Sequence, residues 1–413
     1  MPRQAGKFGI MPHRAPSSRG LTAQLFLISN KETVDERSSF HEKSNWSGGN
    51  WLRERRPLRA GLARAYPGVE WLGLCDVDKE KGEKLSSELS ADFFTTDYVE
   101  LLGRSEVNAV MVCTTNNDHV GPIRATLEAG NKPRMLVEKP LATSAVDSAK
   151  LLKDIEGEDI EAFVGYTQRF RRKYIAVKQQ ILSGHIGDPT SGVAKVFMNG
   201  ISPHHNLSRT EHRSLLTPMV VSGTHCLDMS LWLMGDKKPV EIYSRSVDTA
   251  LGGLGTQDAT FGIFTFEDRA MLSMNMSWAL PLSWPTSAYS MDIGLVGTKG
   301  AILIDDTHRD LVMATDEPHS TFRTKDRPDL VKDGPKVSFL GSYPPGEVMM
   351  GQLWGALREE TNSWLAHLYT GLETPHATAA EGHRNLVLTM AMDYSAKIGK
   401  PVSLPVDLEL LEK

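Results

Sequence analysis

The chain has 413 residues, of which 40% are hydrophobic and 23% are charged, and its formal net charge is −5. This length exceeds one compact core and favours two domains, and the mildly acidic balance argues against nucleic acid or a membrane surface as a partner. The sequence holds three cysteines and no apolar run near the roughly 20 residues of a membrane span, so we expect a reducing, cytoplasmic compartment.

The N-terminal segment is basic, with arginines and lysines but no acidic residue before Glu32. Such a start fits either an organelle transit peptide or a disordered tail. We favour the tail, and with it the cytoplasm, because the apolar stretch 25–28 is too short for a secretory signal.

From residue 51 onward, strand-like and helical segments alternate. The first helix is predicted over 51–66, with Leu58, Leu62 and Ala65 on its apolar face. The next segments are predicted as strands over 69–76, 107–114 and 134–138, and as helices over 79–89 and 119–129. This alternation predicts an α/β Rossmann domain with a parallel sheet over 1–142, in which residues 1–50 are atypical and either inserted or disordered.

The order of predicted helices and strands changes after Pro140. Helices are predicted over 144–155, 173–183, 217–234, 351–368 and 379–398, and one more parallel strand over 162–166. Further strands are predicted over 192–198, 240–247, 259–266, 270–278, 289–296 and 301–305. Because the last five strands follow one another without a helix between them, we expect an α+β domain over 143–413 with a large, mostly antiparallel open sheet.

Polar residues follow the predicted parallel strands, at the sheet edge where such folds bind ligands. Asp76 ends one strand and is placed to accept hydrogen bonds from a ribose, which favours NAD without excluding NADP. Thr114, Thr115, Asn116 and His119 follow the next strand. These small polar residues either let the backbone approach a cofactor or cap the next helix, and both readings stay open.

Glu138, Lys139 and Pro140 follow the third strand. A lysine at this edge either is a surface charge or stabilises an alkoxide as hydride leaves the carbon. The peptide bond before Pro140 is a candidate for the cis form. His225 and Asp228 lie three residues apart on one face of the helix over 217–234, and Asp228 is a candidate substrate contact. The histidine is either a general base or a buried histidine satisfied by its neighbour.

The loop over 199–212 is polar and includes Asn199, His204 and His205. Its histidines, amides and arginine predict a pocket for a hydroxyl-rich ligand such as a sugar or polyol. The histidine pair has no acidic or cysteine partner that would complete a recognisable site, so we predict no metal.

Linked motifs occur in order along the chain: LVEKPLA (136–142), VGYTQRF (164–170) and SGTHCLDMSLWLMG (222–235). Together they resemble the Gfo/Idh/MocA family, named for glucose–fructose oxidoreductase and inositol dehydrogenase. The resemblance implies an NAD(P)-dependent oxidoreductase that moves hydride between the cofactor and a sugar, inositol or similar polyol. It also implies a homo-oligomer formed through the C-terminal sheet.

The resemblance assigns roles to the candidate residues. It implies that Lys139 and His225 face the reacting carbon, while Asp76, the 114–119 turn and Glu138 border the cofactor. Arg169 matches a position near the nicotinamide, and Asn199 a position that contacts substrate.

The sequence departs from the family pattern at two places. The glycine fingerprint expected near residue 51 is missing, and the only nearby glycines are Gly48 and Gly49. Residues 7–10 and 25–29 compete as the first strand, and residues 11–50 are interpreted as an insertion or a mis-spliced segment. The second departure is Val221, which stands where many relatives carry an aspartate four residues before the histidine. Two alternatives therefore stay open, a non-catalytic nucleotide or sugar sensor and an inactive relative with a defective cofactor loop.

Overall fold

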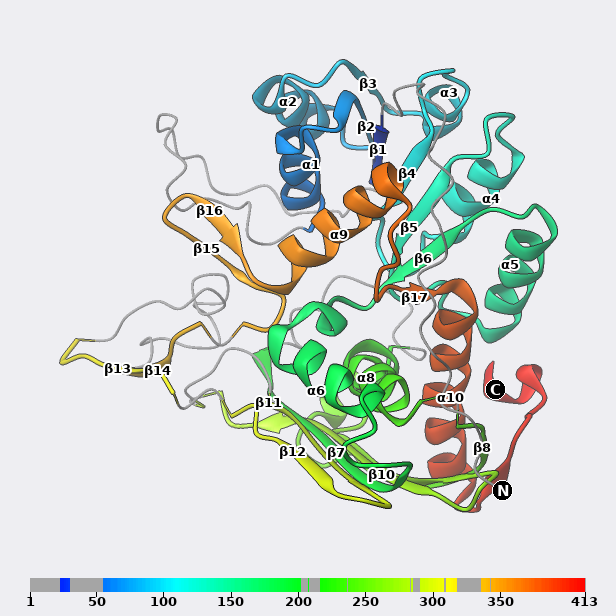
Figure 1. The fold of residues 1–413 in the computed structure, drawn as a ribbon, viewed down its shortest axis with the longest axis vertical. Helices are drawn as coiled ribbons and strands as arrows, with labels where there is room; N and C mark the ends of the chain where they lie inside the picture. Colours follow the sequence, from blue (N-terminus) through cyan, green and yellow to red (C-terminus); the bar gives the residue numbers. More distant parts are fainter. Residues whose placement is uncertain are drawn as a thin grey trace.

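The computed structural model describes residues 23–29, 55–201, 207, 216–235, 237–282, 284, 290–307, 310–317, 336–341 and 343–412. Two seven-stranded sheets dominate this part of the chain, one above the other in Figure 1, with helices packed against both. No helix in the described ranges is long and apolar enough to cross a membrane.

The first sheet has the order β17-β6-β5-β4-β1-β2-β3. Its strands are β1 (Ala23–Ser29), β2 (Val69–Asp76), β3 (Phe93–Thr95), β4 (Ala109–Val112), β5 (Arg134–Glu138), β6 (Ala162–Gly165) and β17 (Ala377–Thr378). All neighbours pair in parallel except β17, which pairs antiparallel with β6. The continuous apolar runs of β4 and β5 fit strands that are covered by helices on both faces.

Helices cover both faces of this sheet. They are α1 (Arg55–Ala65), α2 (Lys79–Leu89), α3 (Tyr98–Leu102), α4 (Val120–Glu128), α5 (Ala145–Gly157) and α9 (Ala356–Thr370). Apolar residues of α3, α4 and α5 form one core with the sheet, while those of α1 and α9 form another. The α/β Rossmann architecture predicted from the alternating segments is confirmed.

The first strand of the sheet is β1, so the structure selects residues 25–29 of the two competing segments. Leu27 pairs with Leu74 of β2 and with Met111 of β4, which places β1 near the centre of the sheet. Residues 23–29 therefore form a strand of the sheet, and the interpretation of residues 11–50 as an insertion stays a prediction. The other candidate, residues 7–10, lies outside the described residues, as do Gly48 and Gly49.

Helix α1 buries a different face from the predicted one. The buried residues are Arg59, Ala60 and Ala63, whereas Ala65, predicted on the apolar face, is exposed. The reason is that Arg59, which reads as a solvated charge in the sequence, is paired with carboxylates in the interior. A buried guanidinium is tolerated only with such partners.

The first sheet takes in more of the chain than residues 1–142. Helix α5 and strand β6 follow this boundary and pack in the same layer, as shown by Leu151 and Val164 in one core cluster. The chain also returns from the second sheet, because Trp364 of α9 packs against α1 and β17 extends the sheet edge. The two layers are therefore tied together by several chain crossings.

The second sheet has the order β12-β11-β7-β10-β9-β8-β18. Its strands are β7 (Pro189–Asn199), β8 (Pro239–Val247), β9 (Ala259–Phe266), β10 (Met271–Leu280), β11 (Ser290–Gly297), β12 (Ala301–Ile304) and β18 (Val402–Ser403). The neighbours pair antiparallel apart from the parallel pair β7–β10, which confirms the predicted mostly antiparallel sheet.

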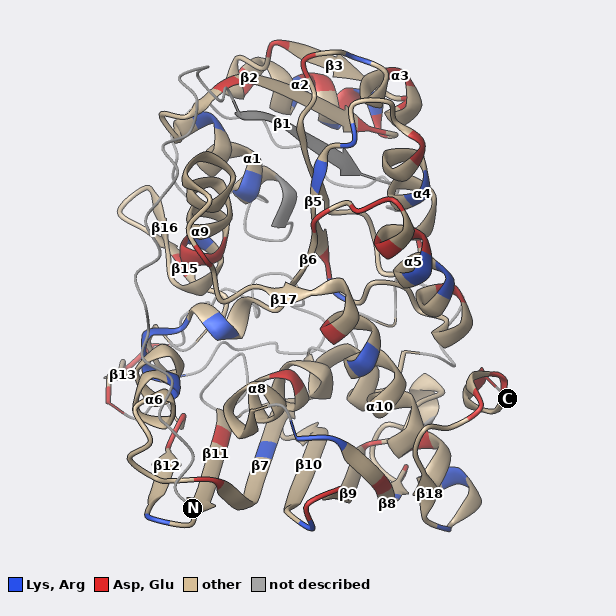
Figure 2. Ribbon diagram, turned by 45° about the vertical axis from the view of Figure 1, so that its right-hand side comes forward, with Lys and Arg blue, Asp and Glu red and all other residues tan. Residues whose placement is uncertain are grey.

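In the described part of the chain, the helices that pack on the second sheet lie on one of its faces. Helices α6 (Arg172–Leu182), α8 (Thr224–Met234) and α10 (Ala379–Ile398) lie on the side that faces the first sheet (Figure 2). The other face leaves large apolar side chains exposed, among them Phe261, Ile263 and Met271. Short polar side chains such as Ser273 and Asn275 alternate with the buried residues of β10, as expected for a strand with one covered face.

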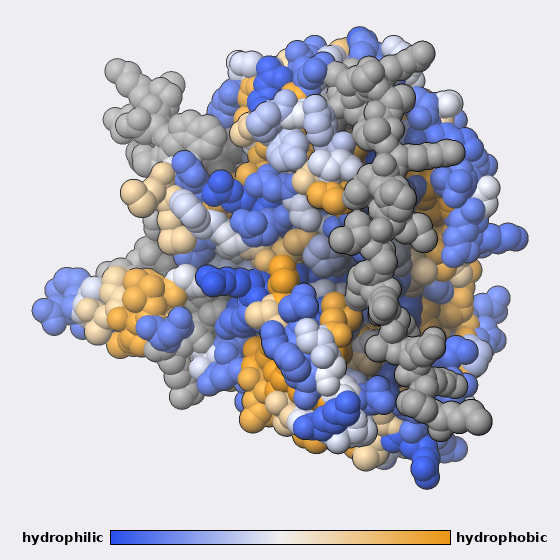
Figure 3. Space-filling model, viewed as in Figure 1, coloured by the Kyte–Doolittle hydropathy of each residue, from blue (hydrophilic) through white to orange (hydrophobic). Residues whose placement is uncertain are grey.

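Two hairpins extend from the body of the molecule between β12 and α9. They are formed by β13 (Val312–Ala314) with β14 (Val337–Phe339) and by β15 (Glu347–Met349) with β16 (Gln352–Trp354). The sequence pattern predicts a helix from residue 351, whereas α9 begins only at Ala356. Apolar side chains gather on the β13–β14 hairpin, at the left of Figure 3, where Leu311, Val312 and Val337 are exposed.

Candidate functional site

The carboxyl ends of the parallel strands carry three of the predicted site residues. Asp76 ends β2, Glu138 ends β5, and Thr114 follows β4 closely. Asp76 Oδ1 accepts a hydrogen bond of 2.9 Å from the Asp78 backbone, which shapes the turn into α2. Because these strands are neighbours of β1 or of one another, the three residues lie along one edge of the sheet.

The turn after β4 is polar and partly buried. Thr115 Oγ1 donates to the Asp118 carboxylate, and Asn116 is half-buried. Thr114 Oγ1 is buried and has no hydrogen-bond partner among the described residues. A buried hydroxyl without a partner is rare in folded proteins and marks a place where a ligand atom can complete the bonding.

His119 joins two of the loops at this edge. Its Nδ1 lies 2.5 Å from the Pro140 carbonyl oxygen and its Nε2 lies 3.2 Å from the Thr114 carbonyl oxygen. Burial lowers the pKa of His119, so the ring is neutral and donates to only one of these carbonyls. These contacts make His119 a link between the turns after β4 and β5, while the predicted contact with a cofactor stays a prediction.

Glu138 belongs to a buried ion-pair group centred on Arg59. Arg59 Nη2 lies 2.7 Å from Glu138 Oε1 and 2.6 Å from Glu360 Oε2. Arg59 Nη1 donates to Thr361 Oγ1 at 2.8 Å, and Thr167 Oγ1 donates to Glu360 Oε2 at 3.1 Å. Burial alone would lower the pKa of Arg59, but the two carboxylates raise it above its ordinary value. The group fixes the end of β5, directly before Lys139.

Lys139 reaches from the first sheet to the helices of the second. The Lys139–Pro140 peptide bond is cis, the form considered for it from the sequence. Lys139 Nζ donates a 2.8 Å hydrogen bond to the backbone carbonyl of Val221. Val221 lies in a π-helical turn, η3 (Met219–Gly223), that leads directly into α8. The position that holds an aspartate in many relatives therefore contributes a backbone oxygen to the lysine here.

His225 lies four residues after Val221, in the first turn of α8. Lys139 therefore contacts the turn that immediately precedes α8, and His225 lies in the first turn of that helix. The Tyr166 ring stands edge-on to the His225 ring, with centroids 5.8 Å apart, and Tyr166 Oη lies 2.8 Å from Thr224 Oγ1. Burial raises the pKa of Tyr166, which keeps its phenol protonated.

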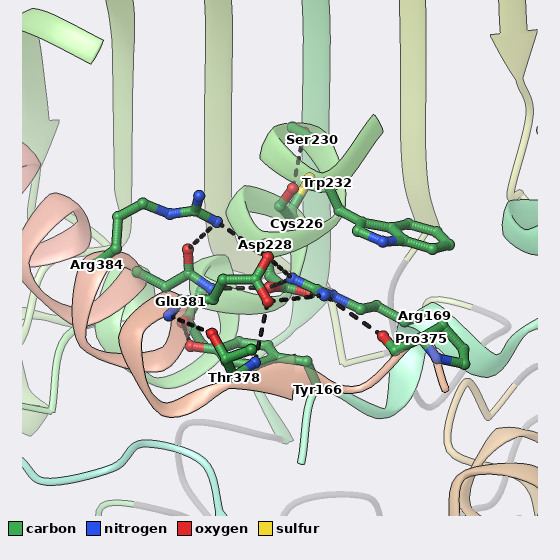
Figure 4. Close-up of polar contacts among 12 residues, drawn as sticks. Tyr166, Arg169, Cys226, Asp228, Ser230, Trp232, Pro375, Thr378, Glu381 and Arg384 are labelled. Carbon is green, nitrogen blue, oxygen red and sulfur yellow. Dashed lines mark hydrogen bonds and ion pairs between the residues drawn. The ribbon is translucent and has the colours of Figure 1, made fainter. Parts of the chain in front are cut away.

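Asp228 and Arg169 bind each other, while the predicted contacts of Asp228 with substrate and of Arg169 with cofactor stay predictions. Arg169 Nε and Nη2 donate to the two Asp228 oxygens at 2.8 and 2.6 Å. Arg169 also binds the Glu381 carboxylate at 3.0 and 3.2 Å (Figure 4). Asn385 donates to Asp228 Oδ1 at 2.8 Å. Both charges are almost fully buried, and buried charges need such pairing.

The remaining predicted site residues are placed only in part. Asn199 ends β7 and is 1% exposed. His204 and His205 lie outside the described residues. Among the described residues, no group of three or more His, Cys, Asp or Glu side chains is arranged to hold a metal ion.

Sequence reasoning missed several residues that shape this site. Arg59 and Glu360 are 301 residues apart, and neither stands in a motif. Tyr166 carried a signal, since it belongs to the VGYTQRF segment and directly precedes the 3₁₀ turn η2 (Thr167–Phe170) with Arg169. Asn385 carried none, because only the packing of α10 against α8 shows its role.

Models of one protein family match both layers of the fold. The model described as an oxidoreductase family with an NAD-binding Rossmann fold matches residues 51–166, and the GFO/IDH/MocA C-terminal domain matches residues 174–303. The chain belongs to the GFO/IDH/MocA family. Membership confirms the predicted fold, the oxidoreductase class and NAD as cofactor.

Individual relatives are distant. A myo-inositol 2-dehydrogenase of Thermotoga maritima is 24% identical over 247 residues, which are 59% of this chain and 70% of that protein. An inositol 2-dehydrogenase of Saccharopolyspora erythraea is 22% identical over 350 residues, 84% of this chain and 91% of that protein. At this identity the likeness leaves the substrate of the present chain open.

Solved structures share the fold. A probable dehydrogenase from Thermotoga maritima has a TM-score of 0.69 and 18% identity, covering 94% of this chain and 99% of its own. A scyllo-inositol dehydrogenase from Lactobacillus casei with bound NAD(H) and scyllo-inositol has a TM-score of 0.67 and 14% identity, covering 93% and 100%. Both likenesses concern the fold alone.

The described residues fit the ribose side of an NAD site. Asp76 stands at the end of β2, where a carboxylate can accept hydrogen bonds from ribose hydroxyls. Thr114 lies on the same sheet edge and has a buried hydroxyl without a hydrogen-bond partner among the described residues. The segment between β1 and α1, where the phosphate-binding turn is expected, lies outside the described residues.

Proposed function

We propose that this protein is an NAD-dependent dehydrogenase of inositol or a similar polyol. The observation that carries the proposal is the hydrogen bond from Lys139 to the π-helical turn that precedes His225. This pair stands beside a sheet edge that fits a nicotinamide cofactor, and the inositol dehydrogenase relatives and fold neighbours support the substrate class.

In the proposed reaction the substrate hydroxyl binds between Lys139 and His225. His225 accepts the hydroxyl proton, and the Lys139 ammonium stabilises the negative charge that develops on the oxygen. NAD, when bound, supplies the acceptor for the hydride that leaves the carbon. The Val221 carbonyl orients the lysine, and the Tyr166 ring limits the orientations open to His225.

Asp76 determines the proposed preference for NAD. Its carboxylate at the end of β2 is suited to a ribose with free hydroxyls and repels a 2′-phosphate. NADP stays a second option, because a basic residue elsewhere along the edge can offset this repulsion.

We also propose a homo-oligomer that forms through the uncovered face of the second sheet. Phe261 and Ile263 are each 47% exposed on β9, and the Phe261 ring stacks on Phe197 of β7 at 6.2 Å. A contiguous apolar face on a sheet is a usual association surface. Ile263→Asp is expected to shift the molecular mass measured by light scattering to that of a smaller species, whereas an unchanged mass would contradict this interface.

The enzyme proposal is tested by comparing wild type with Lys139→Met. The variant keeps an unbranched side chain one atom shorter but removes its charge, and turnover of myo-inositol or scyllo-inositol with NAD should fall about 100-fold or more. NADH affinity, measured by fluorescence titration, should change little. Lys150→Met is the matched control, because Lys150 is exposed on α5, away from the site, and this variant should behave as wild type.

Other outcomes would reject the proposal. Unchanged turnover in Lys139→Met would remove the assigned role of the lysine. Binding of NADH by the wild type without turnover of any polyol in a broad panel would favour a sensor. Absence of NADH binding would identify an inactive relative.

A further inference from the structure

A chain of hydrogen bonds, the polar relay, connects Asp393 of α10 through Thr217 to the π-helical turn η3, whose Val221 carbonyl binds Lys139. It begins at Asp393, a partly buried residue in the C-terminal half of α10. The Asp393 carboxylate accepts a hydrogen bond from Thr217 Oγ1, and its Oδ1 accepts one of 2.9 Å from Gln257 Nε2 and one of 3.5 Å from Thr260 Oγ1. All three donors are neutral side chains that come from outside α10.

Thr217 connects this carboxylate to the turn η3. Its Oγ1 accepts a 3.1 Å hydrogen bond from the Val220 backbone N–H, and its carbonyl accepts one of 3.0 Å from the Val221 N–H. A hydroxyl has one hydrogen to donate. Because Thr217 donates it to Asp393 when that carboxylate is ionised, the oxygen lone pairs are left to face the Val220 N–H. Asp393 therefore orients the cap of the π-helical turn.

The far end of the relay is the candidate site. The turn capped by Thr217 presents the Val221 carbonyl to Lys139 Nζ at 2.8 Å. A π-helical turn holds one residue more than an α-helical turn needs, and it persists only where the surroundings fix it. In this chain the capping bonds of Thr217 and the bond to Lys139 lie on successive residues of the same turn.

We propose that Asp393 and Thr217 are positioning residues that fix the orientation of Lys139 through the η3 turn. The inference rests on the proposed function, in which the Lys139 ammonium stabilises the developing alkoxide. Neither residue touches the reacting atoms. Their effect is on the placement of the turn, and through the Val221 carbonyl on the placement of the ammonium.

The test compares Thr217→Val, Thr217→Ser and Thr260→Val in the full chain. Valine keeps the shape of threonine but cannot cap the turn, so kcat for inositol oxidation should fall about tenfold, since small misplacements of a catalytic group are costly. The serine variant keeps the hydroxyl and should restore most of the rate. Thr260→Val removes a hydroxyl from the same carboxylate without touching η3, and it should leave kcat near wild type.

A second measurement does not depend on turnover. Acetylation of Lys139 by an N-hydroxysuccinimide ester, followed by mass spectrometry relative to the exposed Lys150, reports on the release of the ammonium from its carbonyl acceptor. Thr217→Val should accelerate acetylation of Lys139 several-fold, while Thr217→Ser and Thr260→Val should not.

The outcomes separate this inference from the proposed function. If Lys139→Met abolishes turnover but Thr217→Val changes neither kcat nor acetylation, the positioning role is wrong and the enzyme proposal stands. An equal loss of kcat in Thr217→Val and Thr260→Val would mean that the relay only stabilises the fold, and this result would overturn the inference. If Lys139→Met turns over normally, the catalytic role assigned to Lys139 fails while the dehydrogenase activity stands, and acetylation still decides whether the relay holds the lysine.

Discussion

Arg59 offers the most direct test of how the two layers of the molecule are joined. In Arg59→Met the side chain keeps much of its volume but loses its charge. The carboxylates of Glu138 and Glu360, which lie 2.7 and 2.6 Å from the guanidinium, are then left in the interior without it. Removing one partner of a buried ion pair costs about 3–5 kcal/mol of unfolding free energy, mainly because the remaining charge is buried without compensation.

The measurement is urea unfolding at pH 7, followed by tryptophan fluorescence because Trp364 packs against α1 in the same core. Arg64→Met is the matched control on the same helix. Arg64 also forms an ion pair, with Asp92 at 3.2 Å, but both side chains are about one third exposed. Exposed pairs contribute about 0–1 kcal/mol, so this variant should stay close to wild type.

Restoring charge balance provides a second check. Adding Glu360→Gln to Arg59→Met removes one of the two stranded carboxylates, so the double variant should be more stable than Arg59→Met alone. A loss below about 1 kcal/mol in Arg59→Met would show that the guanidinium does not hold these carboxylates. The buried position of Arg59 on α1 would then need another cause.

Three further predictions concern the second layer. Burial raises the pKa of Asp393 from 3.8 to about 7, so between these two pH values the folded protein holds a proton that the unfolded chain has released. The free energy of unfolding should therefore fall as pH rises through 7, by at most about 4 kcal/mol. Asp393→Asn should flatten the pH dependence of urea midpoints measured from pH 5 to 8. Arg169→Lys loses the two-point contact with Asp228 and should lose about 2–4 kcal/mol in chemical unfolding, whereas a neutral result would contradict the geometry of that pair. Ser222→Ala leaves the buried Trp278 Nε1–H without its 3.0 Å acceptor and should cost about 1–3 kcal/mol by the same assay, with no loss expected if water replaces the hydroxyl.

The elements that sequence reasoning predicted best are those with strong local patterns. The bounds of α2 and α10 match the predicted 79–89 and 379–398, and β5 matches 134–138. A carboxylate in the Asp78 cap of α2 and the capping box of Thr378 and Glu381 at α10 make these ends readable from the sequence. Local chemistry alone decides where such helices begin.

The errors arise where a residue depends on partners far away in the sequence. The buried face of α1 was assigned to leucines because nothing near Arg59 indicates that Glu138 and Glu360 approach it from 79 and 301 residues away. Similarly, nothing in the sequence near Asp228 indicates that Arg169 and Asn385 bind it from other elements. The choice of β1 between two apolar segments also required the sheet, since only pairing with β2 and β4 separates them.

The two buried arginines explain how the candidate site is held between the layers. Arg59 binds the carboxylate that directly precedes Lys139, and Arg169 binds the carboxylate three residues after His225. The turn η2 lies between them, since Thr167 donates to Glu360 of the first group and Arg169 forms the second. Each guanidinium is held by two carboxylates, so neither group can shift without exposing or stranding a charge. The backbone on both sides of the Lys139–His225 pair is therefore fixed by ion pairs that do not themselves enter the proposed reaction. A change in either group should alter the distance between lysine and histidine as well as stability.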